Sequence, residues 1–159
     1  AAFVICHIFI AIPAVPTPHK MVSAMVKAAQ LKEGQVVYDL GAGDARVLVA
    51  AKKDCPSIQA TGYEILPSMW ILGKWNIWRS KFTIEWYRRD FFGGDFSNAD
   101  IVFIYGLPRL LVKLQPKLDT ELKPGTRVVS HAFAFPDREP KEHIKVQCGR
   151  ERNIYVYEL

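Results

Sequence analysis

The chain has 159 residues, of which 50% are hydrophobic, enough for one complete core and too few for two ordinary domains. Its net charge of +5 would suit an anionic partner, but the basic residues form no dense run, so we expect no nucleic-acid partner. Its three cysteines lie far apart without Cys-x-x-Cys spacing, which argues against a metal site or a disulfide framework and favours a reducing compartment.

Residues 1–12 form an uncharged, apolar leader that ends at Pro13. A helix of this length is shorter than the ~20 residues that cross a bilayer. Because the sequence begins without methionine, we interpret the leader as part of a membrane anchor completed upstream, with a buried N-terminal helix as the alternative. Pro13, Pro16 and Pro18 predict that residues 13–19 are an extended linker or lid, followed by one folded domain over 20–159.

From residue 20 onward, helix and strand patterns alternate along the chain. Apolar residues at helical spacing, or a proline in the first turn, predict helices over 20–31, 46–53, 67–80 and 108–122. Short apolar or alternating runs predict strands over 35–39, 58–64, 82–87, 100–105 and 126–133. Two last runs, 144–148 and 153–157, flank 149–152 and predict a hairpin.

The order of these elements predicts an α/β fold with a doubly wound, Rossmann-like sheet. Strand-helix repeats require a mostly parallel sheet with right-handed crossovers and helices on both faces. The closing hairpin adds at least one antiparallel strand. This ending favours a class I methyltransferase fold over a nucleotide-dehydrogenase domain, in which the last strands stay parallel.

The segment Asp39-Leu40-Gly41-Ala42-Gly43-Asp44-Ala45-Arg46 follows a predicted strand and opens a predicted helix. Gly41 and Gly43 allow a tight turn and a close approach of the backbone to a ligand. The carboxylate of Asp39 would repel a pyrophosphate but would accept hydrogen bonds from the amino group of a methionine moiety. The loop therefore favours S-adenosylmethionine over NAD as the cofactor.

Two further acids follow the next two predicted strands. Glu64 lies about twenty residues after the glycine loop, where an acid accepts hydrogen bonds from both hydroxyls of a ribose. Asp90 is placed to accept from the adenine amino group while Phe91 or Phe92 packs on the ring. Alternatively, Asp90 only caps the next short turn.

The acceptor side of the site is expected at the end of the fourth strand. Tyr105 is the candidate for an aromatic wall that holds an amine in line with the transferred methyl group, or it packs against the next helix. His131 is a candidate proton relay or a structural histidine, and Thr17 lies either over the cofactor or in a simple linker. The segment 104–108 lacks the Asn-Pro-Pro-Tyr or Asp-Pro-Pro-Tyr motif that grips nucleobase and amide nitrogens, which disfavours those acceptors.

The predicted helix over 67–80 is crowded with tryptophan. Ile71, Trp75 and Trp78 share one face at helical spacing, for which a core facing the sheet is the first interpretation. The alternative is contact with a membrane interface or an apolar partner, where tryptophan is favoured.

Five segments carry a resemblance to a known family: Val15-Pro16-Thr17-Pro18-His19, Tyr38-Asp39-Leu40-Gly41-Ala42-Gly43-Asp44-Ala45-Arg46, Gly62-Tyr63-Glu64, Ile104-Tyr105-Gly106-Leu107-Pro108 and Leu122-Lys123-Pro124-Gly125. Together they resemble the membrane-associated protein-lysine methyltransferases that modify the mitochondrial ATP synthase c-subunit and the adenine nucleotide translocase, and their prokaryotic relatives. The resemblance spans residues 12–159. It departs at Ala45, where the family usually has glycine, and at Gly106, where it usually has a bulkier apolar residue.

The resemblance implies S-adenosylmethionine-dependent methylation of a lysine in a membrane-associated protein. It also implies a membrane location, on the cytoplasmic face in a prokaryote or mitochondrial in a eukaryote, with the apolar leader contacting the membrane. Open alternatives are methylation of a small molecule or of another protein group, and a non-catalytic cofactor-binding membrane protein.

The residues predicted for the site form two sets. The cofactor set is Thr17, Asp39, Gly41, Ala42, Gly43, Arg46, Glu64, Ile65, Asp90, Phe91 and Tyr105. The catalytic set is Tyr105, Pro108 and His131.

Overall fold

The computed structural model describes residues 16–159 of the chain, so the apolar leader and Pro13 lie outside the described residues. The predictions made for residues 1–15 therefore stay predictions. Among residues 16–159, no helix combines the length and apolar character needed to span a bilayer.

The described elements follow the alternation that the sequence predicts. The helices are α2 (His19–Ala29), α3 (Arg46–Asp54), α4 (Pro67–Ser80) and α5 (Pro108–Glu121), with a short 3-10 helix η1 (Phe91–Gly93). The strands are β1 (Val36–Leu40), β2 (Gln59–Tyr63), β3 (Glu85–Tyr87), β4 (Ile101–Ile104), β5 (Arg127–His131), β6 (Glu142–Cys148) and β7 (Arg150–Glu158).

The strands form one seven-stranded sheet in the order β3-β2-β1-β4-β5-β7-β6. Neighbours from β3 to β5 are parallel, whereas β7 runs antiparallel to both β5 and β6. The doubly wound, mostly parallel sheet with a closing antiparallel hairpin is therefore confirmed. The chain order reverses at β1, between β2 and β4, where such sheets bind their ligands.

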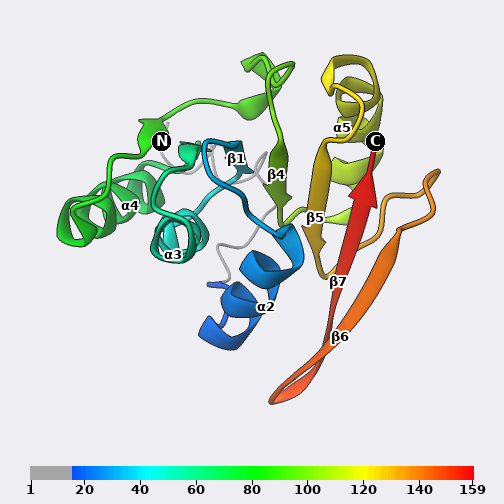
Figure 1. Cartoon of the computed structure of the whole chain (residues 1–159), viewed down its shortest axis with the longest axis horizontal. Helices are drawn as coiled ribbons and strands as arrows, with labels where there is room; N and C mark the ends of the chain where they lie inside the picture. Colours follow the sequence, from blue (N-terminus) through cyan, green and yellow to red (C-terminus); the bar gives the residue numbers. More distant parts are fainter. Residues whose placement is uncertain (1–15) are drawn as a thin grey trace, which may run out of the picture.

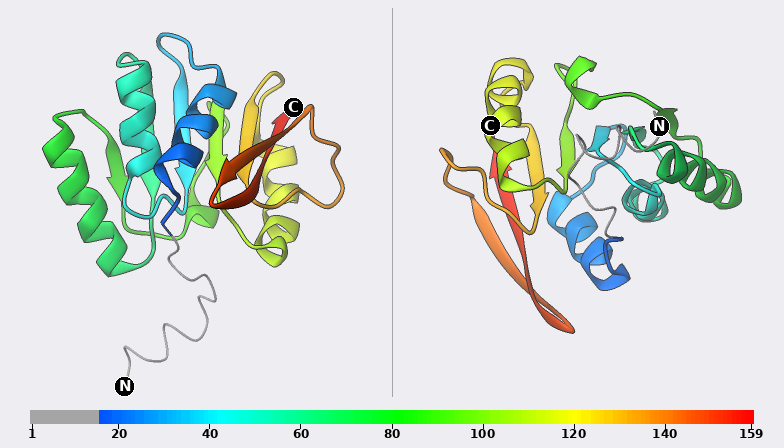
Figure 2. Two further views of the ribbon diagram at one scale, coloured as in Figure 1. Left: turned by 90° about the horizontal axis from the view of Figure 1, so that it is seen from below. Right: turned by 180° about the vertical axis from the view of Figure 1, so that it is seen from behind.

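Helices cover both faces of the sheet (Figure 1). On one face, a core cluster that includes Met21, Met25 and Leu48 joins α2 and α3 to the strands. On the other, a cluster that includes Phe96 and Leu111 joins α5 and the η1 loop to the strands. The two further views show α4 at the outer edge of the molecule, beside α3 (Figure 2).

The hairpin differs from its prediction in where it turns. The sequence pattern assigns Arg150 and Arg152 to the turn, but Cys148 pairs with Arg150, so Gly149 alone forms it and the charged residues belong to β7. The hairpin tip projects beyond the core (Figure 1), so charged side chains reach solvent there without breaking the strand.

The core interpretation of the α4 face is wrong for Ile71, Trp75 and Trp78, which are 62%, 53% and 70% exposed. Gly73 is the buried residue of this helix, and it lies against the indole of Trp86 in β3. A Cβ at Gly73 would come within 2.3 Å of that ring, so only glycine allows α4 to pack this closely. The Trp86 Nε1 also donates to the carbonyl oxygen of Trp70 at 2.9 Å, which fixes the helix from the same side.

Candidate functional site

The carboxyl ends of β1, β2 and β4 surround a cavity of about 600 Å³. Every residue predicted for the cofactor lines it: Thr17, Asp39, Gly41, Ala42, Gly43, Arg46, Glu64, Ile65, Asp90, Phe91 and Tyr105. The structure therefore brings residues from distant parts of the sequence to one site, at the switch point of the sheet.

The glycine loop is held by hydrogen bonds to the end of β2. Gly41 and Gly43 have φ angles of 78° and 58°, in the left-handed region that glycine adopts without strain. The amides of Gly41 and Ala42 donate to the carbonyl oxygen of Tyr63 at 2.9 and 2.8 Å, and the Gly43 amide donates to Glu64 Oε2 at 2.8 Å. Because these three amides are already engaged, they do not form a phosphate cradle, which agrees with the preference for S-adenosylmethionine over NAD.

Asp39 is a buried acid on the wall of this cavity, only 5% exposed. Burial raises the pKa of its carboxyl to about 8, and the nearby charges of Glu64 and Asp44 add to the increase. A cationic group beside Asp39 would relieve both the burial cost and the repulsion between the acids. The ammonium of a methionine moiety has the required charge.

Glu64 presents a carboxylate anchored by the backbone. Its Oε2 accepts from the amide of Gly43 at 2.8 Å and its Oε1 from the amide of Leu66 at 2.7 Å. Burial raises its pKa, and the bonds from backbone amides oppose that increase. Each carboxylate oxygen has a second lone pair, so Glu64 is able to accept hydrogen bonds from ribose hydroxyls as well.

Asp90 caps the short helix η1, since its Oδ1 accepts from the amide of Phe92 at 2.9 Å. The capping interpretation is thus confirmed. Asp90 also lines the cavity together with Phe91 and Phe92, whose rings lie 4.9 Å apart. The cap therefore holds the acid beside the two rings on the cavity wall, and its contact with an adenine stays a prediction.

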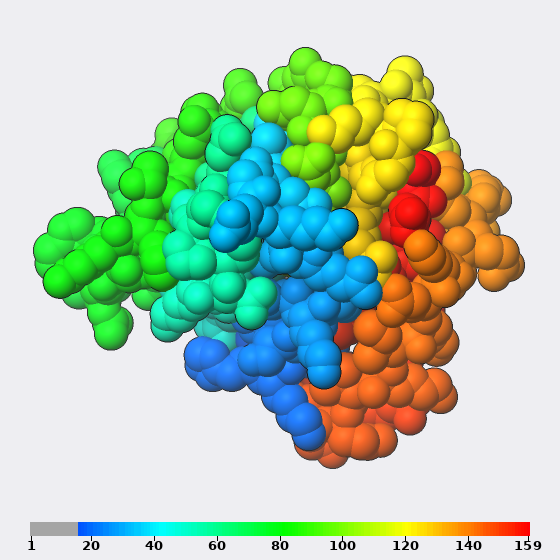
Figure 3. All heavy atoms as spheres, viewed as in Figure 1, coloured from blue at the N-terminus to red at the C-terminus, as the bar shows by residue number. Residues whose placement is uncertain are grey.

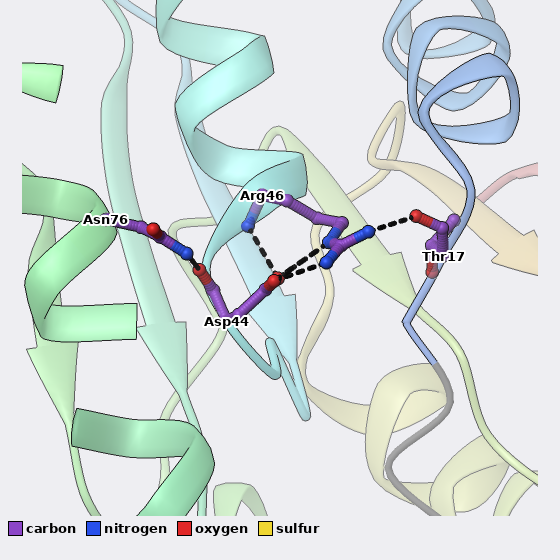
Figure 4. A network of polar contacts seen from close by, with 4 residues as sticks. All are labelled: Thr17, Asp44, Arg46 and Asn76. Atoms are coloured by element: carbon purple, nitrogen blue, oxygen red, sulfur yellow. Dashed lines mark hydrogen bonds and ion pairs between the residues drawn. The ribbon is translucent and has the colours of Figure 1, made fainter. Parts of the chain in front are cut away.

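A polar network joins the glycine loop to the segment before α2 (Figure 4). The Arg46 Nε donates to Asp44 Oδ1 at 2.8 Å, and its Nη1 donates to the carbonyl oxygen of Thr17 at 2.8 Å. Asn76 in α4 donates to the carbonyl oxygen of Asp44 at 2.9 Å. The guanidinium of Arg46 therefore holds Thr17 at the cavity, and Asp44, which the sequence analysis left without a role, positions that guanidinium.

The catalytic candidates Tyr105 and His131 lie against each other, but only Tyr105 lines the cavity. Tyr105 lines the cavity, and the His131 ring packs on it at 4.1 Å between ring centroids. His131 is fully buried and does not line the cavity, and neither ring nitrogen has a partner among the described residues. Its pKa is lowered to about 4, mainly by burial and further by the charge of Arg152.

Pro108 occupies the first turn of α5 and is exposed. It does not line the cavity, although its neighbours Leu107 and Arg109 do. Pro108 thus sets where the helix starts, and no contact with a ligand site follows from its position.

The sequence analysis missed a group of cations that line the cavity: Arg89, Arg109 and Lys113. The Arg89 guanidinium lies over the rings of Tyr63 and Tyr87, at 5.2 and 5.1 Å from their centroids. All three are exposed and form no ion pair with another described residue. Arg89 is one of two adjacent arginines in the sequence, but only the fold shows that it lines the same cavity as Arg109 and Lys113 of α5.

Over residues 16–159, no group of three or more His, Cys, Asp or Glu side chains is arranged to hold a metal ion. Among the acids of the cavity, Glu64 and Asp90 accept from backbone amides and Asp44 pairs with Arg46.

Comparison with known proteins places these features in a family. Residues 39–142 match the family described as ANTKMT methyltransferase domain. The chain is 40% identical to a protein-lysine N-methyltransferase of Saccharolobus islandicus (strain REY15A), over 92% of each chain. It is 33% identical to the lysine N-methyltransferase of the ATP synthase C-subunit from Xenopus laevis, over 84% of this chain and 58% of that protein. The chain thus spans less than two thirds of this vertebrate relative.

Among solved structures, the chain is similar to one described as an RNA methyltransferase from Salinibacter ruber in complex with S-adenosyl-L-homocysteine. The TM-score is 0.84 and the sequence identity 32%, over 91% of this chain and 93% of that chain. A precorrin-6y C5,15-methyltransferase from Geobacter metallireducens has a TM-score of 0.74 at 18% identity, which shows a shared fold.

Proposed function

Because this chain belongs to the ANTKMT methyltransferase domain family, we propose that it transfers a methyl group from S-adenosylmethionine to the side-chain amine of a lysine in a protein. The observation that carries this proposal is the 40% identity, over 92% of both chains, to an archaeal protein-lysine N-methyltransferase. The chain is an S-adenosylmethionine-dependent methyltransferase, and the acceptor is the part that we propose.

The acids of the cavity fit this cofactor, which supplies an electrophilic methyl group on a sulfonium when bound. Asp39 offers a buried carboxylate for the ammonium of the methionine moiety, and Glu64 offers lone pairs for the ribose. Asp90 and Phe91 line the same cavity and are our candidates for contact with the adenine. The chain itself binds and orients the reactants, and positioning supplies much of the catalysis in such a displacement.

Two cations on the acceptor side favour a neutral amine. A lysine side chain has an ordinary pKa near ~10.4 and must lose its proton before it attacks a methyl group. Arg109 and Lys113 line the cavity from α5, which follows β4, and they disfavour a further positive charge beside them, so they lower the pKa of a lysine bound there. Tyr105 offers an aromatic wall for the neutral amine on the acceptor side.

We further propose that the methylated protein is associated with a membrane and that the chain works at a membrane surface in a reducing compartment. Four relatives are named for the ATP synthase C-subunit and one for the adenine nucleotide translocase, which supports substrates of this kind. The apolar leader over 1–12 is a candidate for the contact with the membrane.

RNA is the second candidate acceptor, because the Salinibacter ruber structure is named an RNA methyltransferase. The loop after β4 argues against methylation of a nucleobase amine. Tyr105, Gly106 and Leu107 provide no carboxylate or amide side chain to grip such a nitrogen.

Mass spectrometry of cell membranes and RNA separates these candidates. Both fractions are incubated with the chain and S-adenosylmethionine that carries a deuterated methyl group, and protein digests and nucleosides are then analysed. We expect the label on lysine side chains of membrane proteins, and no label with a Glu64→Ala variant. Label on nucleosides alone would replace the lysine proposal with the RNA candidate, and label on soluble proteins alone would contradict the membrane-associated substrate.

A further inference from the structure

The outer face of α4 is an apolar surface that the rest of the described structure leaves uncovered. We call it the α4 surface and define it by Ile71, Leu72, Trp75 and Trp78. These side chains are 62%, 43%, 53% and 70% exposed. The two indole rings lie 5.0 Å apart, so they form one continuous aromatic area. The spheres of α4 protrude at the left edge of the molecule in Figure 3.

Helical geometry explains why these residues gather on one side. At ~100° per residue, Ile71, Trp75 and Trp78 fall within roughly 60° of one another, and Gly73 lies about opposite. The Gly73 side is occupied by Trp86, which attaches α4 to the sheet. The apolar residues therefore point outward because the helix is held from the other side.

The charged side chains of α4 itself are all positive. The helix sequence PSMWILGKWNIWRS contains no acidic residue. Lys74 and Arg79 flank the apolar stripe on its two sides, and Lys81 follows the end of the helix. None of these three cations forms an ion pair with another described residue. Their charges are available to an anionic partner.

We propose that the α4 surface docks on an anionic lipid bilayer. Tryptophan is favoured where one end of a side chain meets hydrocarbon and the other meets water, and flanking Lys and Arg reach anionic headgroups. Lysine is depleted from protein–protein interfaces, so this combination favours lipid over an apolar protein partner. The proposal does not depend on which group is methylated.

Docking through α4 would also bring the cavity close to the membrane. Ile65, Leu66 and Met69, just before and within the first turn of α4, line the cavity wall. Ile65 is itself 41% exposed, so an apolar side chain lies at the cavity wall just before α4.

Co-sedimentation with vesicles tests this surface on the full chain, without a methyl acceptor. Vesicles of phosphatidylcholine mixed with phosphatidylglycerol are compared with phosphatidylcholine alone, using the wild type, Trp75→Ser/Trp78→Ser and Lys74→Glu/Arg79→Glu. We expect the wild type to prefer the anionic vesicles, and we expect the affinity of each double variant for them to fall at least about tenfold. Quenching by brominated lipids should be strong for the wild type and mostly lost in Trp75→Ser/Trp78→Ser.

Matched controls separate the α4 surface from general effects. Val112→Ser removes an exposed apolar side chain elsewhere, and Lys32→Glu/Lys53→Glu reverses the same amount of charge on other exposed positions. Both should bind like the wild type. Unchanged binding in the α4 variants would mean that another segment holds the membrane and would overturn the proposal. If the α4 variants lost cross-links to membrane proteins but bound vesicles like the wild type, the surface would be assigned to a protein partner, and the proposal would be overturned equally.

Discussion

At the scale of single residues, Asp39 is the group whose chemistry is most tightly linked to the cofactor. Its carboxyl must be ionised to attract an ammonium, yet its pKa is raised to about 8 by burial and by neighbouring acids. Ligand binding should therefore release a proton below pH 8, and the affinity for S-adenosylhomocysteine should rise with pH up to about 8. Calorimetry in buffers of different ionisation enthalpy measures both quantities.

The matched variant is Asp39→Asn, which keeps the shape of the side chain and removes its titration. We expect the variant to bind S-adenosylhomocysteine more weakly at pH 8. Its affinity should also depend less on pH, because the titration of Asp39 is removed and only that of the ligand, which is common to both proteins, remains. Since the folded pKa lies above the ordinary value of 3.8, Asp39 also lowers folding stability as pH rises from about 4 to about 8. Identical pH profiles for variant and wild type would mean that Asp39 does not face the ammonium.

Tyr105 should affect turnover more than cofactor affinity. Replacing it with alanine removes the aromatic wall beside the cavity, so the amine is held less well in line. We expect kcat to fall roughly 10- to 100-fold for Tyr105→Ala, with little change in the Kd of the cofactor. Tyr105→Phe keeps the ring and should keep most of the activity. Full turnover by the alanine variant would defeat the role assigned to this side chain.

His131 should make the fold sensitive to acid. Its folded pKa of about 4 lies below the ordinary value of 6.5, so the unfolded chain takes up the proton first. The stability that His131 contributes is present above pH 6.5 and is lost as pH falls through about 4, by roughly 3 kcal/mol at most.

Urea unfolding of wild type and His131→Phe between pH 7 and 4 measures this effect. Phenylalanine keeps a ring against Tyr105 and does not titrate, so its unfolding free energy should fall less steeply with acid. Parallel curves for the two proteins would show that His131 is not held neutral. A proton-relay role for His131 is a separate prediction that requires access to the cavity.

At the scale of elements, α4 depends on one close contact between Gly73 and Trp86. A methyl group at Gly73 would come within 2.3 Å of the indole, whose Nε1 is fixed on Trp70. Gly73→Ala should lower the unfolding free energy by about 1–2 kcal/mol, although alanine favours a helix by roughly 0.5–1 kcal/mol. Ser68→Ala, at an exposed position of the same helix, should be nearly neutral. A stabilised Gly73→Ala protein would show that the indole moves aside freely.

The same helix shows the limit of prediction from sequence. The spacing of Ile71, Trp75 and Trp78 predicts one apolar face correctly, but spacing does not state what covers that face. The sheet side of α4 is instead built around Gly73, with Ile77 partly buried against the core, and glycine has no hydrophobic side chain to reveal that side. The turn of the β6–β7 hairpin was misplaced for a related reason, since Arg150 and Arg152 are polar residues in a strand that extends beyond the core.

At the scale of the whole molecule, the doubly wound, mostly parallel sheet and the meeting of the predicted cofactor residues at one cavity follow from sequence, because local patterns locate the strand ends. Strand and helix periodicity places Asp39 and Glu64 after consecutive strands, and parallel strands bring those ends together. The cations of the cavity wall were not predictable in this way. Arg89 and Lys113 come from elements on opposite sides of the switch point, and only the folded chain brings them to one cavity.

The cavity combines buried acids with exposed cations. Asp39 and Glu64 are buried, whereas Arg89, Arg109 and Lys113 are exposed on the wall of the same cavity. The buried acids favour a cationic ligand beside them.

A crystal structure of the chain with S-adenosylhomocysteine tests the central claim most directly. We predict the amino group of the ligand within hydrogen-bond distance of Asp39, the ribose hydroxyls on Glu64, and the adenine between Asp90 and Phe91. A nucleoside bound in any other place, or with its ribose turned away from Glu64, would contradict the account of this site.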